Sequence, residues 1–269
     1  MSAPENPPRR FELAAAQPSL AGASAVVTGA GRGIGRAIAL ELAARGADVL
    51  VHTGARQEAA EAVAAEIRQS GREATVVVCD LAEPSHHESL LRAALAWRRT
   101  LDIWINNAGA DVLTGPAAQD TFETKLERLW QVDVRATIRL GRIVGAVMKQ
   151  QGRGAILNMG WDQAQWGMAG DSGEMFAAVK GAVMAFSRSL ARSLAPEVRV
   201  NCLAPGWIKT AWGQQVSDDW QARAGRESLL GRWGTPEDVA RAACFLVSPE
   251  AAFINGQIVA INGGWRSPG

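Results

Sequence analysis

Tyrosine is absent from the 269 residues of this chain, and histidine and cysteine occur only three times each. Cys79, Cys202 and Cys244 show no metal-ligand spacing, so we expect reduced thiols in a cytoplasmic protein and no bound metal. No apolar run approaches the roughly 18–20 residues of a membrane span. The formal net charge is only +1, and a strongly basic surface for nucleic acid is therefore not expected. We expect neither a membrane nor nucleic acid as a partner, but a small-molecule substrate.

Short, β-branched runs alternate along the chain with amphipathic helical stretches. This alternation predicts an α/β fold: a single doubly wound, Rossmann-type domain with a parallel seven-stranded sheet flanked by helices. The expected strands are Ser24–Thr28, Asp48–His52, Thr75–Cys79, Ile103–Asn106, Ala155–Asn158, Arg199–Leu203 and Gln257–Ile261. The expected helices are Gly33–Arg45, Gln57–Ser70, Pro84–Arg98, Thr124–Gln150, Gly173–Leu194 and Pro236–Leu246.

Two segments stand outside this alternation. Residues 1–21 are rich in Pro, Arg and Glu, so we predict a disordered N-terminal arm before a single domain at 22–269. Residues 207–231 are polar, weakly periodic and contain tryptophan. A long segment of this kind inside a compact domain is typical of a lid, and we predict a substrate lid here.

A glycine-rich run between the first strand and the first helix predicts a dinucleotide site. Thr28-Gly29-Ala30-Gly31-Arg32-Gly33-Ile34-Gly35 lets the backbone turn sharply and directs the N-terminus of a helix at a pyrophosphate. The second strand ends in His52-Thr53-Gly54-Ala55-Arg56, without the acid that would bind a ribose 2′-hydroxyl. Arg32 and Arg56 are both placed to reach a 2′-phosphate. We therefore predict NADP(H) as the cofactor, with NAD(H) the less favoured alternative.

Further segments extend the pattern: Asn106-Asn107-Ala108-Gly109, Cys79-Asp80-Leu81, Pro205-Gly206-Trp207-Ile208-Lys209-Thr210, Ile261-Asn262-Gly263-Gly264 and Phe176-Ala-Ala-Val-Lys180. Together with the glycine run they resemble the short-chain dehydrogenase/reductase family, over roughly residues 22–265. The resemblance implies that Asp80 and Leu81 contact the adenine, and that Asn107, Ala108 and Gly109 pack on the adenosine. It also implies that Pro205, Gly206, Ile208 and Thr210 hold the nicotinamide carboxamide, that Lys180 holds the nicotinamide ribose, and that the chain forms a homotetramer or homodimer.

The family's catalytic set of Asn, Ser, Tyr and Lys is preserved here only at Lys180. Asp133 stands at the Asn position, and Phe176 stands at the Tyr position. The Ser position falls on Trp161, Asp162 or Gln163, depending on where a short insertion lies. A phenyl ring has no ionisable proton, so any proton transfer needs another acid.

Three carboxyl groups could supply that proton. We favour Asp162, just past the fifth strand, because partial desolvation between tryptophans would raise its pKa. Asp171 and Glu174 stand where helix-start acids are common. Trp161, Trp166, Trp207 and Trp212 are predicted to line a cleft for a flat substrate, although core or interface filling explains them as well.

Three functions follow from this pattern. The first is an atypical NADP(H)-dependent oxidoreductase that moves hydride to or from a small, possibly planar, C=O, C=N or conjugated C=C substrate. The second is a catalytically silent NADP(H)-binding sensor or scaffold. The third is a non-redox isomerase, lyase or cyclase on the same fold.

Overall fold

A computed structural model describes residues 20–210 and 218–264 of the chain. Within them, seven strands form one sheet in the order β3-β2-β1-β4-β5-β6-β7, and every neighbouring pair is parallel. The predicted fold is confirmed. The strands are β1 (Ser24–Val27), β2 (Asp48–Thr53), β3 (Ala74–Val78), β4 (Ile103–Asn106), β5 (Gly154–Met159), β6 (Val198–Pro205) and β7 (Ile258–Ile261).

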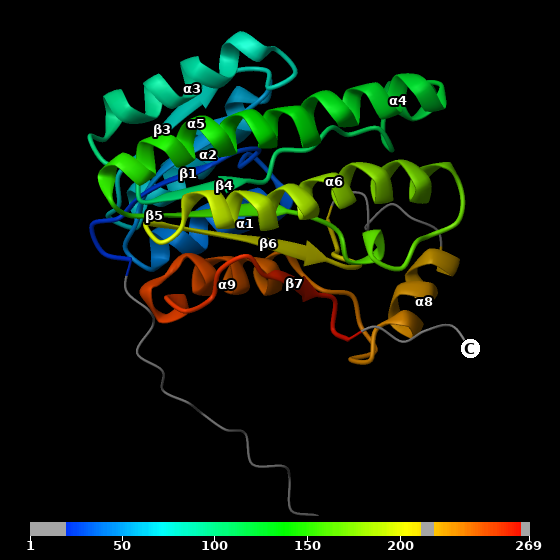
Figure 1. Cartoon of the computed structure of the whole chain (residues 1–269). Helices are drawn as coiled ribbons and strands as arrows, with labels where there is room; N and C mark the ends of the chain where they lie inside the picture. Colours follow the sequence, from blue (N-terminus) through cyan, green and yellow to red (C-terminus); the bar gives the residue numbers. More distant parts are fainter. Residues whose placement is uncertain (1–19, 211–217, 265–269) are drawn as a thin grey trace, which may run out of the picture.

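Helices cover both faces of this sheet (Figure 1). On one face α1 packs between α2 and α9, and on the other α5 packs between α3 and α6. Two apolar clusters, one on each side of the sheet, fill the layers between helices and strands. The helices are α1 (Gly33–Ala44), α2 (Gln57–Gln69), α3 (Pro84–Trp97), α4 (Phe122–Leu129), α5 (Ala136–Gln151), α6 (Asp171–Leu194), α8 (Asp218–Glu227) and α9 (Pro236–Val247).

The single helix predicted at Thr124–Gln150 is wrong in detail. The structure has α4, then a π-helical segment at Trp130–Arg135, then α5. No glycine or proline marks this break in the sequence. π-helical turns inside α-helices are frequent at functional sites, and this one carries Asp133.

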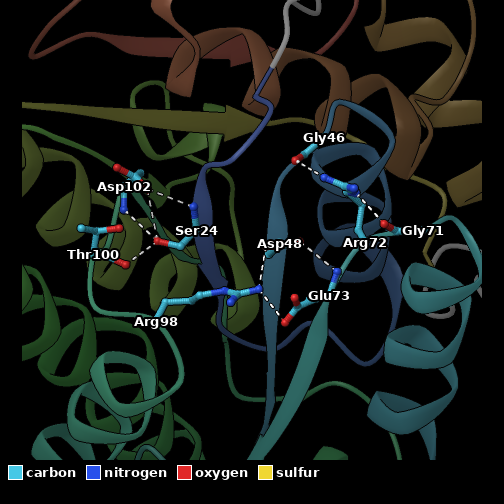
Figure 2. A network of polar contacts seen from close by, with 9 residues as sticks. All are labelled: Ser24, Gly46, Asp48, Gly71, Arg72, Glu73, Arg98, Thr100 and Asp102. Atoms are coloured by element: carbon cyan, nitrogen blue, oxygen red, sulfur yellow. Dashed lines mark hydrogen bonds and ion pairs between the residues drawn. The ribbon is translucent and has the colours of Figure 1, made fainter.

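The amino ends of the strands are tied together by polar contacts far from the expected site (Figure 2). Arg98, just after α3, forms ion pairs of 2.7 Å with both Asp48 and Glu73. Asp102 accepts a hydrogen bond of 3.0 Å from the Ser24 backbone N–H. These contacts hold the amino ends of β1, β2 and β4 together. The expected site lies at the opposite edge of the sheet, where the loops follow the carboxyl ends of the strands.

The two segments outside the predicted alternation are described only in part. Residues 1–19 of the predicted arm lie outside the described range. Leu20, which the prediction placed in that arm, is part of the apolar core, and its N–H donates to the Arg45 carbonyl at 2.7 Å. Within the predicted lid, residues 207–210 and 218–231 are described, and they include α8, a helix that the sequence did not predict. No helix in the described part of the chain is both long and apolar enough to cross a membrane.

Candidate active site

Two glycines in the turn after β1, Gly29 and Gly35, have no room for a side chain. A Cβ on Gly35 would lie 2.3 Å from the Gly29 carbonyl oxygen, and a Cβ on Gly29 would lie 2.8 Å from the Ala108 Cα. Gly33 adopts a φ of +54°, and a Cβ there would meet nothing nearer than Thr210, at 3.7 Å. The turn is therefore tight on its inner side and open toward a groove, as a phosphate-binding backbone requires.

Side chains from β1 and β4 hold this turn in place. The Thr28 hydroxyl accepts hydrogen bonds from the N–H groups of Asn107 and Ala108, at 2.9 and 3.0 Å. The Asn107 amide donates in return to the Thr28 and Gly29 carbonyls. β1 and β4 lie side by side where the strand order reverses, and open α/β sheets bind ligands at that point.

A cleft of about 1010 Å³ opens there along the carboxyl edge of the sheet. Of the predicted cofactor residues, only Pro205, Gly206 and Ile208 do not line it. The predicted residues that do line it are Gly29, Gly31, Arg32, Gly33, Ile34, Gly35, Thr53, Arg56, Asp80, Leu81, Asn107, Ala108, Gly109, Lys180 and Thr210.

Two arginines, Arg32 and Arg56, line the cleft near the β1 and β2 ends. Arg56 directly precedes α2 at the tip of β2, and Arg32 directly precedes α1 after β1. Between them, His52 carries no charge near neutral pH, because burial lowers its pKa to about 4. The His52 Nδ1 accepts from the Gly29 N–H at 3.3 Å, and its Nε2 lies 2.9 Å from the Cys79 carbonyl. The absence of an acid at the β2 tip and the two arginines fit a phosphorylated ribose.

Elsewhere along the cleft, a buried carboxylate contacts Lys180, the lysine of the Phe176-Ala-Ala-Val-Lys180 segment. Lys180 Nζ lies 2.7 Å from Asp133 Oδ1 and donates to the Met159 carbonyl at 3.3 Å. The second oxygen of Asp133 accepts the Ala110 N–H at 2.9 Å. The Asp133 side chain is 2% exposed and that of Lys180 is 13% exposed. The π-helical segment thus places the Asp133 carboxylate next to Lys180, with both of its oxygens engaged in polar contacts.

One aromatic ring, that of Phe176, lines the cleft beside this pair, and a second ring packs against it. Phe176 lines the cleft one helical turn before Lys180. Its ring meets that of Trp161 edge to face, with the centroids 6.2 Å apart. Of the three residues onto which the Ser position could fall, Trp161 is therefore the one whose side chain contacts Phe176.

The Asp162 carboxylate forms hydrogen bonds outside the residues that line the cleft. Its Oδ2 accepts a hydrogen bond from the Asn262 amide at 3.0 Å, and its Oδ1 accepts the Gln163 N–H at 2.8 Å. A Cβ on Gly206 would lie 2.9 Å from the same Oδ2. Burial raises the pKa of Asp162, as predicted, while the hydrogen bonds from Asn262 and Gln163 oppose that rise. The carboxyl does not line the cleft, so its role as proton donor stays a prediction.

The other residues predicted to act on substrate are scattered. Asp171 and Glu174 are exposed in the first turn of α6. Trp166 is 64% exposed, and Trp207 packs against Trp233 and donates to Glu227 of α8 at 2.7 Å. Trp212 lies outside the described residues. The proposed substrate role of the tryptophans remains a prediction.

Several lining residues were missed by the sequence reasoning, chiefly because they follow the recognised motifs without a pattern of their own. The loop after Gly109 forms a long stretch of the cleft wall, and Asp111 in it pairs with Arg32 at 3.0 Å. The missed lining residues are His52, Gly54, Ala55, Ala110, Asp111, Val112, Leu113, Thr114, Gly115 and Val132. In the described part of the chain, no group of three or more His, Cys, Asp or Glu side chains could hold a metal ion.

The fold and the cleft define a dinucleotide-binding α/β protein. Comparison with known proteins narrows the class: the enoyl-(acyl carrier protein) reductase family profile matches residues 29–266. The chain belongs to the short-chain dehydrogenase/reductase family.

Relatives align over nearly the whole chain. The short-chain reductase protein NovJ of Streptomyces niveus is 35% identical, over 94% of this chain and 96% of its own. The 3-oxoacyl-[acyl-carrier-protein] reductase FabG of Escherichia coli is 34% identical, over 90% and 97%. A short-chain dehydrogenase of Burkholderia cenocepacia, solved in complex with NADP, is 33% identical, with a TM-score of 0.82 over 91% of this chain and 98% of that one.

Proposed function

We propose that this chain is an NADP(H)-dependent oxidoreductase that transfers hydride to or from a small, planar substrate without a tyrosine acid. The observation that carries the proposal is the Asp133–Lys180 pair of 2.7 Å in the wall of the cleft, which Phe176 also lines with Trp161 packed against its ring. The arginines at the cleft and the NADP complex of the Burkholderia cenocepacia relative support the choice of NADP(H). Bound NADPH would supply the hydride.

Within this cleft, the chain's own residues take separate tasks. The glycine turn and the N-terminus of α1 bind the diphosphate. Lys180, held by Asp133, presents an ammonium group to the nicotinamide ribose and to charge that develops on the substrate. The Phe176 and Trp161 rings exclude water and offer a flat apolar face.

The missing hydroxyl restricts the substrate class. Hydride addition to a simple ketone produces an alkoxide that needs a nearby acid, and losing a positioned acid typically costs about 10²–10⁴ in rate. Hydride addition to an iminium gives a neutral amine and needs no proton. Addition to a conjugated C=C gives an enolate, which the Lys180 ammonium can stabilise until solvent protonates it. We therefore place iminium and conjugated C=C substrates ahead of simple ketones.

Asp162 remains the candidate donor for substrates that do need a proton. Its pKa is raised by burial, which favours the protonated form that a general acid requires. Its carboxyl lies next to Gly206 and Asn262, so the proton would have to pass around the Gly206 backbone. The variant Asp162→Asn separates this donor role from the Lys180 role.

The test is a panel of matched iminium, enone and ketone substrates with NADPH, followed by loss of reduced-nicotinamide absorbance. We expect turnover of at least one iminium or enone at a rate that exceeds the matched ketone by about tenfold or more. Lys180→Met should abolish it, and Asp162→Asn should do so only if Asp162 supplies the proton. Ketone reduction that is faster than both other classes would contradict the proposal.

A silent NADP(H)-binding sensor or scaffold is the second candidate, favoured by Phe176 at the family's Tyr position and by the lack of a serine at any of the three positions onto which its Ser could fall. It predicts saturable NADPH binding without oxidation of the cofactor by any member of the panel. A non-redox isomerase, lyase or cyclase would instead yield product with no change in cofactor absorbance.

Cytoplasmic location and assembly as a homotetramer or homodimer complete the proposal. The family resemblance supports the assembly, and the free thiols of all three cysteines support a reducing compartment. Sedimentation as a monomer at micromolar concentration would contradict the predicted assembly.

A further inference from the structure

One ion pair at the cleft joins the start of α1 to the loop after β4. Arg32 Nη2, at the start of α1, lies 3.0 Å from Asp111 Oδ2, in the loop after β4. Both residues line the cleft. Their side chains are 47% and 31% exposed, so the pair is accessible to solvent and to an entering ligand.

The two partners differ in how firmly they are held. Asp111 Oδ1 accepts the N–H groups of Leu113 and Thr114, at 3.3 and 3.1 Å. Its Oδ2 also accepts the Thr114 hydroxyl at 2.6 Å. Among residues 20–210 and 218–264, the Arg32 side chain hydrogen-bonds to Asp111 alone. The carboxylate is therefore fixed in its loop, and the long arginine side chain is the partner that can move.

Because of the strand order, the Arg32 side chain can extend either toward the loop after β4 or toward the tip of β2. β1, which precedes Arg32, lies between β4 and β2 in the sheet. Asp111 follows β4 on one side, and Arg56 stands at the tip of β2 on the other. The 2′-phosphate of NADP(H) belongs at the β2 tip, because the ribose binds there. Arg32 therefore turns away from that position when it pairs with Asp111.

We propose that Asp111 sets the cofactor preference of this protein by competing with the 2′-phosphate for the Arg32 guanidinium. Binding of NADP(H) then exchanges one anionic partner of Arg32 for another, whereas binding of NAD(H) leaves the pair intact. The affinity gained from the 2′-phosphate is thereby reduced by the strength of the pair. This inference rests on the proposed function, since it needs NADP(H) to bind in the cleft.

The test measures dissociation constants for NADPH and NADH by quenching of tryptophan fluorescence, in the parent protein and in Asp111→Asn. The asparagine keeps an oxygen for the Leu113 and Thr114 N–H groups. Its uncharged NH2 group replaces Oδ2 and can donate to the Thr114 hydroxyl, which donates to Oδ2 in the parent protein. Exposed ion pairs contribute modestly, so we expect the ratio of the NADH to the NADPH dissociation constant to rise about two- to fivefold. The ratio is used because the lost charge also affects the diphosphate that both cofactors share.

Two further variants make the result specific. In an Arg32→Met background, Asp111→Asn should leave the ratio unchanged, because no guanidinium remains to compete for. Asp120→Asn is the matched control, since Asp120 has the same 31% exposure and pairs with Arg128 at 2.5 Å, and neither residue lines the cleft. It should change neither dissociation constant, and thermal denaturation of each variant verifies folding.

The outcomes separate this inference from the function on which it rests. Parent protein that binds neither cofactor would refute both. Parent protein that binds NADPH, with an unchanged ratio in Asp111→Asn, would refute only the competition. Equal weakening of both cofactors would also overturn it, because the pair would then act as a clasp over any bound dinucleotide.

Discussion

Replacing Asp133 by asparagine should destabilise the protein even though asparagine is the residue that the family carries there. The change removes the charge 2.7 Å from Lys180 Nζ and leaves an ammonium that is only 13% exposed. Breaking a buried ion pair by removing one partner typically costs about 3–5 kcal/mol. Lys180 keeps the Met159 carbonyl at 3.3 Å, and the new amide oxygen can still accept the Ala110 N–H. We therefore expect the lower end of that range, about 3 kcal/mol.

The assay is urea denaturation of the parent, Asp133→Asn, Lys180→Met and the double variant. Both single variants should lower the free energy of unfolding, and the double variant should lose less than the sum, because it buries no unpaired charge. The expected coupling lies between about 1 and 3 kcal/mol. Additive losses, or an Asp133→Asn protein within about 0.5 kcal/mol of the parent, would refute the ion pair as the element that holds Lys180 in the cleft.

Three further predictions concern other parts of the site. Burial raises the pKa of Asp162 above its usual 3.8, so the folded protein binds that proton more tightly than the unfolded chain and loses stability as pH rises through the raised pKa. The free energy of unfolding of the parent minus that of Asp162→Asn should therefore fall as pH rises, and an increase with pH would contradict this prediction. Gly35→Ala should prevent folding or NADPH binding, because its Cβ would lie 2.3 Å from the Gly29 carbonyl oxygen, whereas Gly54→Ala, which meets nothing within 4 Å, should fold normally in thermal denaturation. Phe176→Tyr restores a phenol one helical turn before the lysine and should raise ketone reduction by about tenfold or more; an unchanged steady-state rate would show that another group limits the reaction.

The sequence predicted every end of the seven strands to within two residues, because buried parallel strands are short, β-branched runs. It also predicted most of the residues that line the cleft, since the glycine turn has a strict spacing, and their contacts with the cofactor stay a prediction. The π-helical segment at Trp130–Arg135 was not predictable from periodicity, because its composition is that of an ordinary helix. The hydrogen bond between Asp162 and Asn262 was not predictable either, because the sequence spacing did not show where the short insertion after β5 lies. Arg32 and Asp111 are 79 residues apart, and only the strand order brings them together.

The central claim is that this cleft transfers hydride without a tyrosine, and deuterium transfer tests it most directly. The protein is incubated with NADPH that carries deuterium at the transferable position of the nicotinamide, together with the iminium and enone panel, and the products are analysed by mass spectrometry. The account predicts a product that contains one deuterium with the parent protein and none with Lys180→Met. Saturable NADPH binding with no deuterated product from any substrate would contradict it and would identify the chain as a silent dinucleotide-binding protein.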